Sequence, residues 1–349
     1  MRMAQGIERV GRSIQMSGFF RTVSTYLPRR RSGRLLLFLM VAVLASFACA
    51  TLMSCGMTEG LELRRIEFGG DTRSYYLHVP ISTDASTGAP LIIALHRFTE
   101  TGAWMAKMTG FNALADSESF LVAYPNGKSR RFSFRPGADP DDAAFVLAVI
   151  EDIAAIHVID RSRVYLTGAS NGGFLVHKLA CEHPETFAAT APVMATFIRE
   201  SAETCRPGNH MPMMIIHGDA DPLVPYGTDS VFAGPGMTLE VLSVPETVAF
   251  WAEQNGCLAT PVAEALPDIA PGDGTTAVRE TYLGEDGLAR VVHIKVQQGG
   301  HTWPGGWEPW PAFIVGKQNE DFSATRMIWD FFKQHRREDP LSPEETHVP

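Results

Sequence analysis

The sequence has little basic charge, few cysteines and no apolar run of membrane-spanning length. Its 30 Lys and Arg residues are outnumbered by 39 Asp and Glu residues, which gives a formal net charge of −9. That balance argues against a nucleic-acid-binding protein, since such proteins neutralise phosphates with basic side chains. The five cysteines and 11 histidines form no cluster with zinc-ligand spacing. We therefore expect no nucleic-acid partner, no metal site and no organic cofactor.

The first 55 residues differ in kind from the rest of the chain. A basic stretch that ends at Arg34 precedes an uncharged apolar run over residues 35–50, which is shorter than the roughly 20 residues of a spanning helix. This order predicts an export signal over residues 1–55. The segment Leu52-Met53-Ser54-Cys55-Gly56 resembles a bacterial lipobox with Cys55 as the lipidation site. Cleavage at Ala48-Cys49-Ala50 and an uncleaved anchor are the alternatives.

Export has consequences for location and for the cysteines. We expect the mature protein either in the cell envelope, on a lipid attached to Cys55, or free outside the cell. A membrane is expected as a partner only through that lipid. In an oxidising compartment disulfides persist, and with Cys55 acylated the three cysteines Cys181, Cys205 and Cys257 remain. A bridge between Cys181 and Cys205 is the favoured pairing, and three buried thiols are the alternative.

Short apolar segments alternate with helical patterns over residues 62–337, which predicts one α/β domain with a mostly parallel sheet and helices on both faces. In the first two expected strands apolar and polar residues alternate, which predicts that these strands are antiparallel. The expected strands are Glu62–Phe68, Arg73–Pro80, Leu91–Leu95, Phe120–Tyr124, Arg163–Thr167, Met213–Ile216 and Val291–Val296. The expected helices are Asp141–Ile156, Phe174–Glu182, Val244–Glu253 and Ala324–His335. Residues 56–61 predict a linker, and the polar, Pro-rich residues 338–349 predict a disordered tail.

The strongest local pattern is Gly168-Ala169-Ser170-Asn171-Gly172-Gly173. It fits G-x-S-x-G and stands between a predicted strand and a predicted helix, which is the context that this motif requires. The tight turn gives the serine strained backbone angles and leaves room only for glycine at the flanking positions. The start of the following helix favours negative charge. We therefore expect Ser170 to be a nucleophile.

A serine hydroxyl becomes a nucleophile only when a base takes its proton, and in this type of site an acid and then a histidine follow it in the chain. Asp219 and Asp221 both lie in a loop after a late strand. We favour Asp221 because a Pro-x-x-Pro segment directly after it would stiffen the loop, and Asp219 remains the alternative. His301 follows the last predicted strand between pairs of glycines, so we expect it to be the base. His217 could support the acid loop.

Acyl transfer creates an oxyanion that needs aimed N–H donors. The backbone N–H of Asn171, directly after the nucleophile, is one expected donor. The other is expected from the loop His96-Arg97-Phe98-Thr99-Glu100, and we favour Phe98 N–H. Glycine is usual in the place of Arg97, and arginine does not adopt positive φ at low cost. The loop therefore takes a different path, strains Arg97 or forms a weaker hole. The Arg97 side chain either binds a substrate carboxylate or points into solvent.

Many segments of the chain are shared with a known family. The most specific is Gly300-His301-Thr302-Trp303-Pro304-Gly305-Gly306. The others include Arg73–Pro80, Ala113–Asp116, Val122–Gly127, Asp141-Asp142, Leu179–Glu182, His217–Pro222 and Ser243–Thr247. Over roughly residues 73–335 the chain resembles the polyhydroxybutyrate-depolymerase-type esterase family of the α/β-hydrolase superfamily, which includes exported lipoproteins and feruloyl and acetylxylan esterases. The resemblance implies Ser170, Asp221 and His301 as the catalytic triad.

The chain departs from this family in two places. Arg97 replaces the glycine of the His-Gly pair. Many relatives have a cysteine ahead of the histidine strand that could pair with the counterpart of Cys257, whereas this chain has none between Leu258 and His301. The resemblance therefore implies an unpaired Cys257.

The resemblance implies a secreted serine carboxylic-ester hydrolase that acts through an acyl-enzyme on hydroxyalkanoate oligomers or small esters. Feruloyl or acetylxylan esterase activity is an alternative within the family. An exported serine peptidase of the same fold and a non-catalytic surface binding lipoprotein are the other hypotheses. Trp303, Trp307 and Trp310 flank the His301 loop and either face the substrate or pack the loop. Nothing in the sequence sets the oligomeric state.

Overall fold

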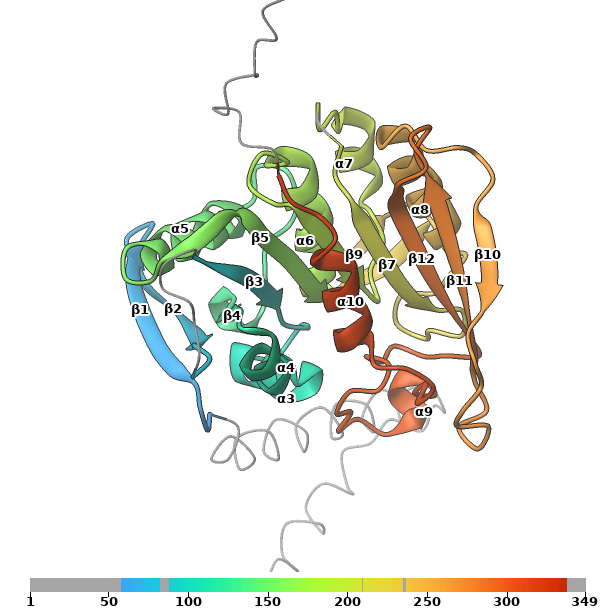
Figure 1. Cartoon of the computed structure of the whole chain (residues 1–349), viewed down its shortest axis with the longest axis horizontal. Helices are drawn as coiled ribbons and strands as arrows, with labels where there is room; N and C mark the ends of the chain where they lie inside the picture. Colours follow the sequence, from blue (N-terminus) through green and yellow to red (C-terminus); the bar gives the residue numbers. More distant parts are fainter. Residues whose placement is uncertain (1–57, 82–87, 209, 235–236, 338–349) are drawn as a thin grey trace, which may run out of the picture. The chain divides into compact units, whose positions relative to one another are not determined.

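The computed structural model describes residues 58–81, 88–208, 210–234 and 237–337 (Figure 1). The predicted export signal (1–55), its lipidation candidate Cys55 and the predicted tail (338–349) lie outside the described residues. So does the beginning of the predicted linker (56–61). Within the described ranges, no helix is both long and apolar enough to cross a membrane.

A ten-stranded sheet forms the centre of the fold, in the order β1-β2-β4-β3-β5-β6-β7-β12-β11-β10. Its strands are β1 (Glu62–Phe68), β2 (Asp71–His78), β3 (Ala89–Leu95), β4 (Leu121–Pro125), β5 (Ile159–Ala169), β6 (Ala189–Val193), β7 (Met213–Gly218), β10 (Val262–Ala265), β11 (Thr276–Leu283) and β12 (Ala289–Gln297). Neighbours from β4 to β12 are parallel. The outer strands pair antiparallel, as predicted for β1 and β2. Strands β8 (Ser230–Gly234) and β9 (Met237–Glu240) form a separate pair.

Helices cover both faces of the sheet (Figure 1). They are α3 (Gly102–Thr109), α4 (Phe111–Glu118), α5 (Asp142–Ala154), α6 (Asn171–Glu182), α7 (Arg199–Thr204), α8 (Val244–Gln254), α9 (Ala312–Val315) and α10 (Ala324–Phe332). On β3, Leu91, Ile93 and Leu95 share a core with α5, α6 and α8, whereas Ile92 and Ala94 pack with α3, α4 and α10. Successive strand side chains point to opposite faces, so β3 is buried at every position. The predicted α/β-hydrolase fold is confirmed.

A disulfide joins α6 to the end of α7. Cys181 in the last turn of α6 and Cys205, directly after α7, form the bridge that the sequence favoured, with a Cα–Cα distance of 5.7 Å. Cys257 is a free, partly buried thiol, and burial raises its pKa. The bridge therefore fixes the C-terminal end of α6, the helix whose first residue directly follows Ser170.

Candidate active site

The turn between β5 and α6 holds Ser170 in a conformation that few residues adopt. Its φ of 52° and ψ of −116° lie outside the allowed regions for most side chains. A Cβ added to Gly172 would stand 2.4 Å from the carbonyl oxygen of Leu95, and one added to Gly168 would meet Gly172 at 2.7 Å. The backbone N–H of Ser170 donates to Val193 O at 2.9 Å. Glycine is therefore required on both sides, and the turn stands firmly at the end of the sheet.

The histidine and the acid form a buried pair. His301 Nδ1 donates to Asp221 Oδ2 at 2.7 Å, and their side chains are 3% and 0% exposed. The other oxygen of Asp221 accepts from the backbone N–H groups of Leu223 and Val224, both at 2.8 Å. Burial pushes the pKa of Asp221 upward, but the adjacent His301 outweighs it and holds that pKa below its ordinary value. Asp221 is therefore an ionised partner that fixes the imidazole with Nδ1 protonated.

Asp219 and His217, the two other candidates near the acid, have structural roles. Asp219 Oδ1 accepts from the backbone N–H of Gln298 at 2.7 Å, so this carboxylate braces the turn after β12 rather than the imidazole. His217 Nε2 donates to Val224 O at 2.8 Å and lies 3.5 Å from Asp221 Oδ2. Burial lowers the pKa of His217, so it is a neutral support of the acid loop.

The sheet gathers these residues at one edge. Ser170 follows β5, Asp221 follows β7 and His301 follows β12, and these strands are parallel and separated only by β6. The Ala220 N–H donates to Gly299 O at 3.0 Å, which ties the acid loop to the histidine loop. Ser170 Oγ makes no hydrogen bond within the described residues, and in ligand-free sites the serine–histidine bond often tightens only with substrate.

Both expected oxyanion donors lie at this edge. Asn171 occupies the first turn of α6, where backbone N–H groups have no partner in the helix. Its side chain pairs with the backbone of Phe132, accepting at 2.6 Å and donating at 3.0 Å. Phe98, in the loop after β3, is 58% exposed. That loop is fixed by Thr99 N–H, which donates to Arg130 O at 2.8 Å.

Arg97 does not point into solvent, so that prediction is wrong, and its pairing inside the protein argues against the other predicted role, binding of a substrate carboxylate. Its buried guanidinium joins two carboxylates: Nε donates to Glu100 Oε1 at 2.9 Å, Nη1 to Glu308 Oε2 at 2.7 Å and Nη2 to Glu308 Oε1 at 3.3 Å. Burial opposes its charge, but the two glutamates raise its pKa above the ordinary value. The positive φ of this loop falls at Thr99, at 69°. Of the predicted alternatives, the loop therefore follows a different path, and Arg97 is a buried strut, that is, a side chain that joins Glu100 and Glu308 inside the protein.

The two carboxylates that pair with Arg97, Glu308 and Glu100, were not predicted from the sequence. Glu308 is 211 positions from Arg97, so nothing in the local pattern pointed to it. An arginine in a glycine position was the available signal, because a buried arginine requires carboxylate partners. Through Glu308, the oxyanion loop is bonded to the segment that follows His301.

The two tryptophans proposed for substrate binding differ. Trp303 is 1% exposed, packs against Phe111 with ring centroids 6.3 Å apart, and donates from Nε1 to Thr325 Oγ1 at 3.0 Å. Its predicted substrate contact is wrong, because it is a core residue that packs the histidine loop. Trp307 is partly exposed and packs on Trp104 at 5.5 Å, so it remains a candidate.

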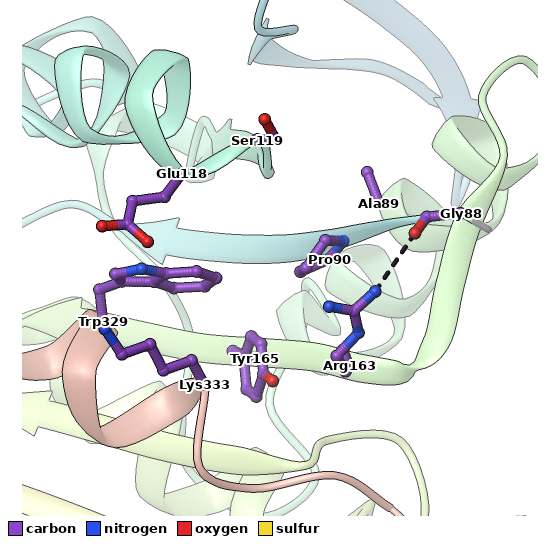
Figure 2. A pocket seen from close by; sticks show the side chains of 9 residues that line it. All are labelled: Gly88, Ala89, Pro90, Glu118, Ser119, Arg163, Tyr165, Trp329 and Lys333. Carbon is purple, nitrogen blue, oxygen red and sulfur yellow. Dashed lines mark hydrogen bonds between the residues drawn. The ribbon is translucent and has the colours of Figure 1, made fainter. Parts of the chain in front are cut away.

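A cavity of about 240 Å³ lies at the other end of the sheet (Figure 2). It is lined by Gly88, Ala89, Pro90, Glu118, Ser119, Arg163, Tyr165, Trp329 and Lys333. Its cations are already paired, Arg163 with Asp160 at 2.6 Å and Lys333 with Asp330 at 2.5 Å. Because β3 begins here and the elbow follows the far end of the parallel β5, this cavity is separate from the Ser170 site. No cluster able to hold a metal occurs among the described residues.

Comparisons with known proteins find relatives of this chain among esterases. The sequence profile of the family described as Esterase PHB depolymerase matches residues 73–203. An esterase-named protein of Nocardia uniformis subsp. tsuyamanensis, NocK, is 35% identical over 283 residues, which are 77% of this chain and 81% of that protein. Poly(3-hydroxyalkanoate) depolymerase C of Paucimonas lemoignei is 35% identical over 127 residues, 34% of this chain and 30% of the relative. The chain therefore spans less than a third of that depolymerase.

Solved structures show the same fold. The acetyl xylan esterase of Aspergillus awamori superposes with a TM-score of 0.50 at 18% identity, over 69% of this chain and 94% of the other. A thermostable esterase gives a TM-score of 0.53 at 16% identity, over 80% and 64% of the two chains. Because NocK is 35% identical over most of both sequences, the chain belongs to the PHB-depolymerase esterase family and is a carboxylic ester hydrolase.

Proposed function

We propose that the protein is a serine esterase in which Ser170, Asp221 and His301 form the catalytic triad. The observation that carries the proposal is the buried 2.7 Å bond from His301 Nδ1 to Asp221 Oδ2, at the same edge of the sheet as a serine held at φ 52°. A fixed tautomer with Nδ1 protonated leaves Nε2 free to accept a proton. This is the arrangement that acyl transfer requires.

The reaction follows from these positions. His301 Nε2 takes the proton of Ser170 Oγ as that oxygen attacks the ester carbonyl carbon. The N–H groups of Asn171 and Phe98 stabilise the oxyanion of the tetrahedral intermediate. Its collapse breaks the ester C–O bond, and His301 returns the proton to the leaving alcohol. Water, deprotonated by His301, then attacks the acyl carbon; the bond from that carbon to Ser170 Oγ breaks, the acid leaves and His301 returns the proton to Ser170 Oγ. Asp221 stabilises the imidazolium in both halves.

Hydroxyalkanoate oligomers or other small esters are the proposed substrates. Support comes from the named depolymerase relative and from the exposed apolar Phe98 at the site. Feruloyl or acetylxylan ester hydrolysis is the second candidate, favoured by a relative in Aspergillus oryzae named as a probable feruloyl esterase, 27% identical over 237 residues. We further propose export through residues 1–55 and a lipid on Cys55.

A peptidase and a non-catalytic binding protein are the competing hypotheses. The strained Ser170 turn argues against a mere binding role, because strain of this kind is kept where it serves the chemistry. An arginine in place of the usual glycine would favour a binding role if it weakened the oxyanion hole, but the internal ion pairs of Arg97 give it a structural role instead.

One substrate panel tests these proposals. It contains p-nitrophenyl esters of increasing chain length, hydroxybutyrate oligomers, methyl ferulate, acetylated xylan and a peptide p-nitroanilide. Folded Ser170→Ala protein is the blank. We expect the wild type to hydrolyse the esters above this blank and to leave the anilide intact. Equal rates for wild type and Ser170→Ala on every ester would refute the serine mechanism, and preference for the anilide would favour the peptidase.

A further inference from the structure

The loop that follows β4, residues 127–136, borders both halves of the proposed oxyanion hole. The carbonyl of Arg130 accepts from Thr99 N–H in the loop that carries Phe98. The backbone of Phe132 pairs with the side chain of Asn171 through two hydrogen bonds. These bonds flank Arg131, so the loop is held against the site on both sides of this arginine.

The loop packs its aromatic side chains inward. The Phe132 ring lies 4.5 Å from the ring of His96, and Phe134 stacks on Phe174 of α6 at 5.0 Å. Arg131 is extended, with φ −151° and ψ 153°, so its side chain points away from the side that Phe132 buries. Accordingly Phe132 is buried and Arg131 is exposed.

The loop also carries backbone strain next to the site. Ser129 and Arg130 are consecutive left-handed residues, with φ of 54° and 60°. Serine and arginine rarely adopt this region, because the Cβ atom then comes too close to the following carbonyl oxygen. Strain of this sort persists where it serves a function. Here it lies at Ser129 and Arg130, beside the hydrogen bond that Arg130 O accepts from Thr99 N–H.

Three arginines of this loop have no ion-pair partner in the part of the chain that the structure describes. Among the described residues, Arg130, Arg131 and Arg135 take part in no ion pair, whereas the neighbouring Lys128 pairs with Asp71. Three carboxylates follow the loop in sequence, Asp139, Asp141 and Asp142. The last of these is bonded to Arg73, and Asp141 caps α5. Of these, only Asp142 is in an ion pair, so three arginines stand against Asp139 and Asp141 and this loop keeps an excess of positive charge in a chain whose formal net charge is −9.

We propose that this site prefers esters that carry a free carboxylate, which Arg130, Arg131 and Arg135 recognise. The inference rests on the proposed function, since it names the substrate class of the same Ser170 site. Guanidinium groups bind carboxylates through paired, charge-assisted hydrogen bonds. Arg97 cannot fill this role because Glu100 and Glu308 occupy its donors. The carboxylate can stand on the acyl or on the alcohol part of the ester.

Two matched pairs of esters test the preference for a carboxylate and show whether it is recognised on the acyl or on the alcohol part. Monomethyl succinate against methyl succinamate carries the charge on the acyl side, and 3-(butyryloxy)propanoate against 3-(butyryloxy)propanamide carries it on the alcohol side. Each pair differs only in carboxylate against amide. The quantity measured is the ratio of kcat/KM for the anionic and the neutral member, at low and high salt, for the wild type and for Arg130→Gln, Arg131→Gln and Arg135→Gln.

We expect at least one pair to give a ratio above one. Each of the three variants should lower that ratio by about fivefold, as for the loss of one partly exposed charge-assisted contact. Raising the salt to about 1 M should also lower it, because the screening length falls to about 3 Å. Arg161→Gln is the control, since Arg161 is exposed, paired with Glu151 and at the far end of β5; its ratio should equal that of the wild type.

Either of two results would overturn the inference: ratios of one or less for both pairs, or ratios that fall equally in Arg161→Gln. Failure of the proposed function would look different, because neither member of either pair would then be hydrolysed above the Ser170→Ala blank.

Discussion

Replacing Arg97 by methionine should destabilise the protein strongly. The arginine is buried and bonds the carboxylates of Glu100 and Glu308, whose side chains are 4% and 5% exposed. Methionine fills similar volume but leaves both carboxylates without their cation. One oxygen of Glu100 already has no hydrogen-bond partner, so this site has no reserve of donors to replace the guanidinium.

The size of the effect follows from the burial. Removing one partner of a buried ion pair costs about 3–5 kcal/mol, because the remaining charge is left uncompensated. This is a large fraction of the roughly 5–15 kcal/mol that separates folded from unfolded domains. We therefore expect Arg97→Met to lower the free energy of unfolding by about 4 kcal/mol at pH 7. Adding Glu100→Gln and Glu308→Gln should recover much of that loss, because no buried charge then remains.

Urea unfolding followed by tryptophan fluorescence measures these free energies. Arg161→Met serves as the control, since Arg161 pairs with Glu151 at the surface and exposed pairs contribute about 0–1 kcal/mol. A loss below about 1 kcal/mol in Arg97→Met, or no recovery in the triple variant, would refute the view of Arg97 as a buried strut.

Three further predictions follow from the site and the core. Asp221→Asn should reduce kcat on p-nitrophenyl butyrate by about 10⁴-fold, because the imidazole loses its fixed tautomer, whereas Asp219→Asn should change it far less. Burial lowers the pKa of His177 to about 3; the unfolded state then binds more protons, so the melting temperature should fall as pH drops from about 6.5 towards 3, and His177→Gln should flatten that slope in a pH series of thermal melts. Replacing Cys181 and Cys205 by serine should lower the free energy of unfolding by about 3–4 kcal/mol, given their separation of 24 residues; unchanged urea midpoints would contradict this.

The sequence predicted those parts of the fold whose signal is local. Continuous apolar runs identified β3 and β7, because a strand covered on both faces excludes polar side chains. Strand β6 (Ala189–Val193) escaped prediction, since alanine and Pro192 are poor strand formers and only its central place between β5 and β7 makes it one. Of the outer strands, β10 is exposed at every position and β11 is mostly half-buried, and they owe their structure to the pairing of β10 with β11 and of β11 with β12.

The candidate site divides in the same way. The turn around Ser170 is determined by residues adjacent in the sequence, so its strain and the need for glycine were predictable. The choice of Asp221 over Asp219 rested on loop stiffness, and the structure gives a direct bond to His301. The environment of Arg97 could not be predicted from the sequence, because folding brings its partner Glu308 from 211 positions away. For Trp303 the sequence left substrate contact and packing of the loop open, and the structure shows that it packs in the core.

Labelling with a fluorophosphonate probe, followed by peptide mass spectrometry, tests the central claim most directly. The Asp221–His301 pair and the strained turn should make Ser170 the one serine that reacts. We predict an adduct on the peptide that contains Ser170, slower labelling in His301→Ala, and no adduct in Ser170→Ala. A folded wild-type protein that stays unlabelled, or an adduct that persists in Ser170→Ala, would contradict the account.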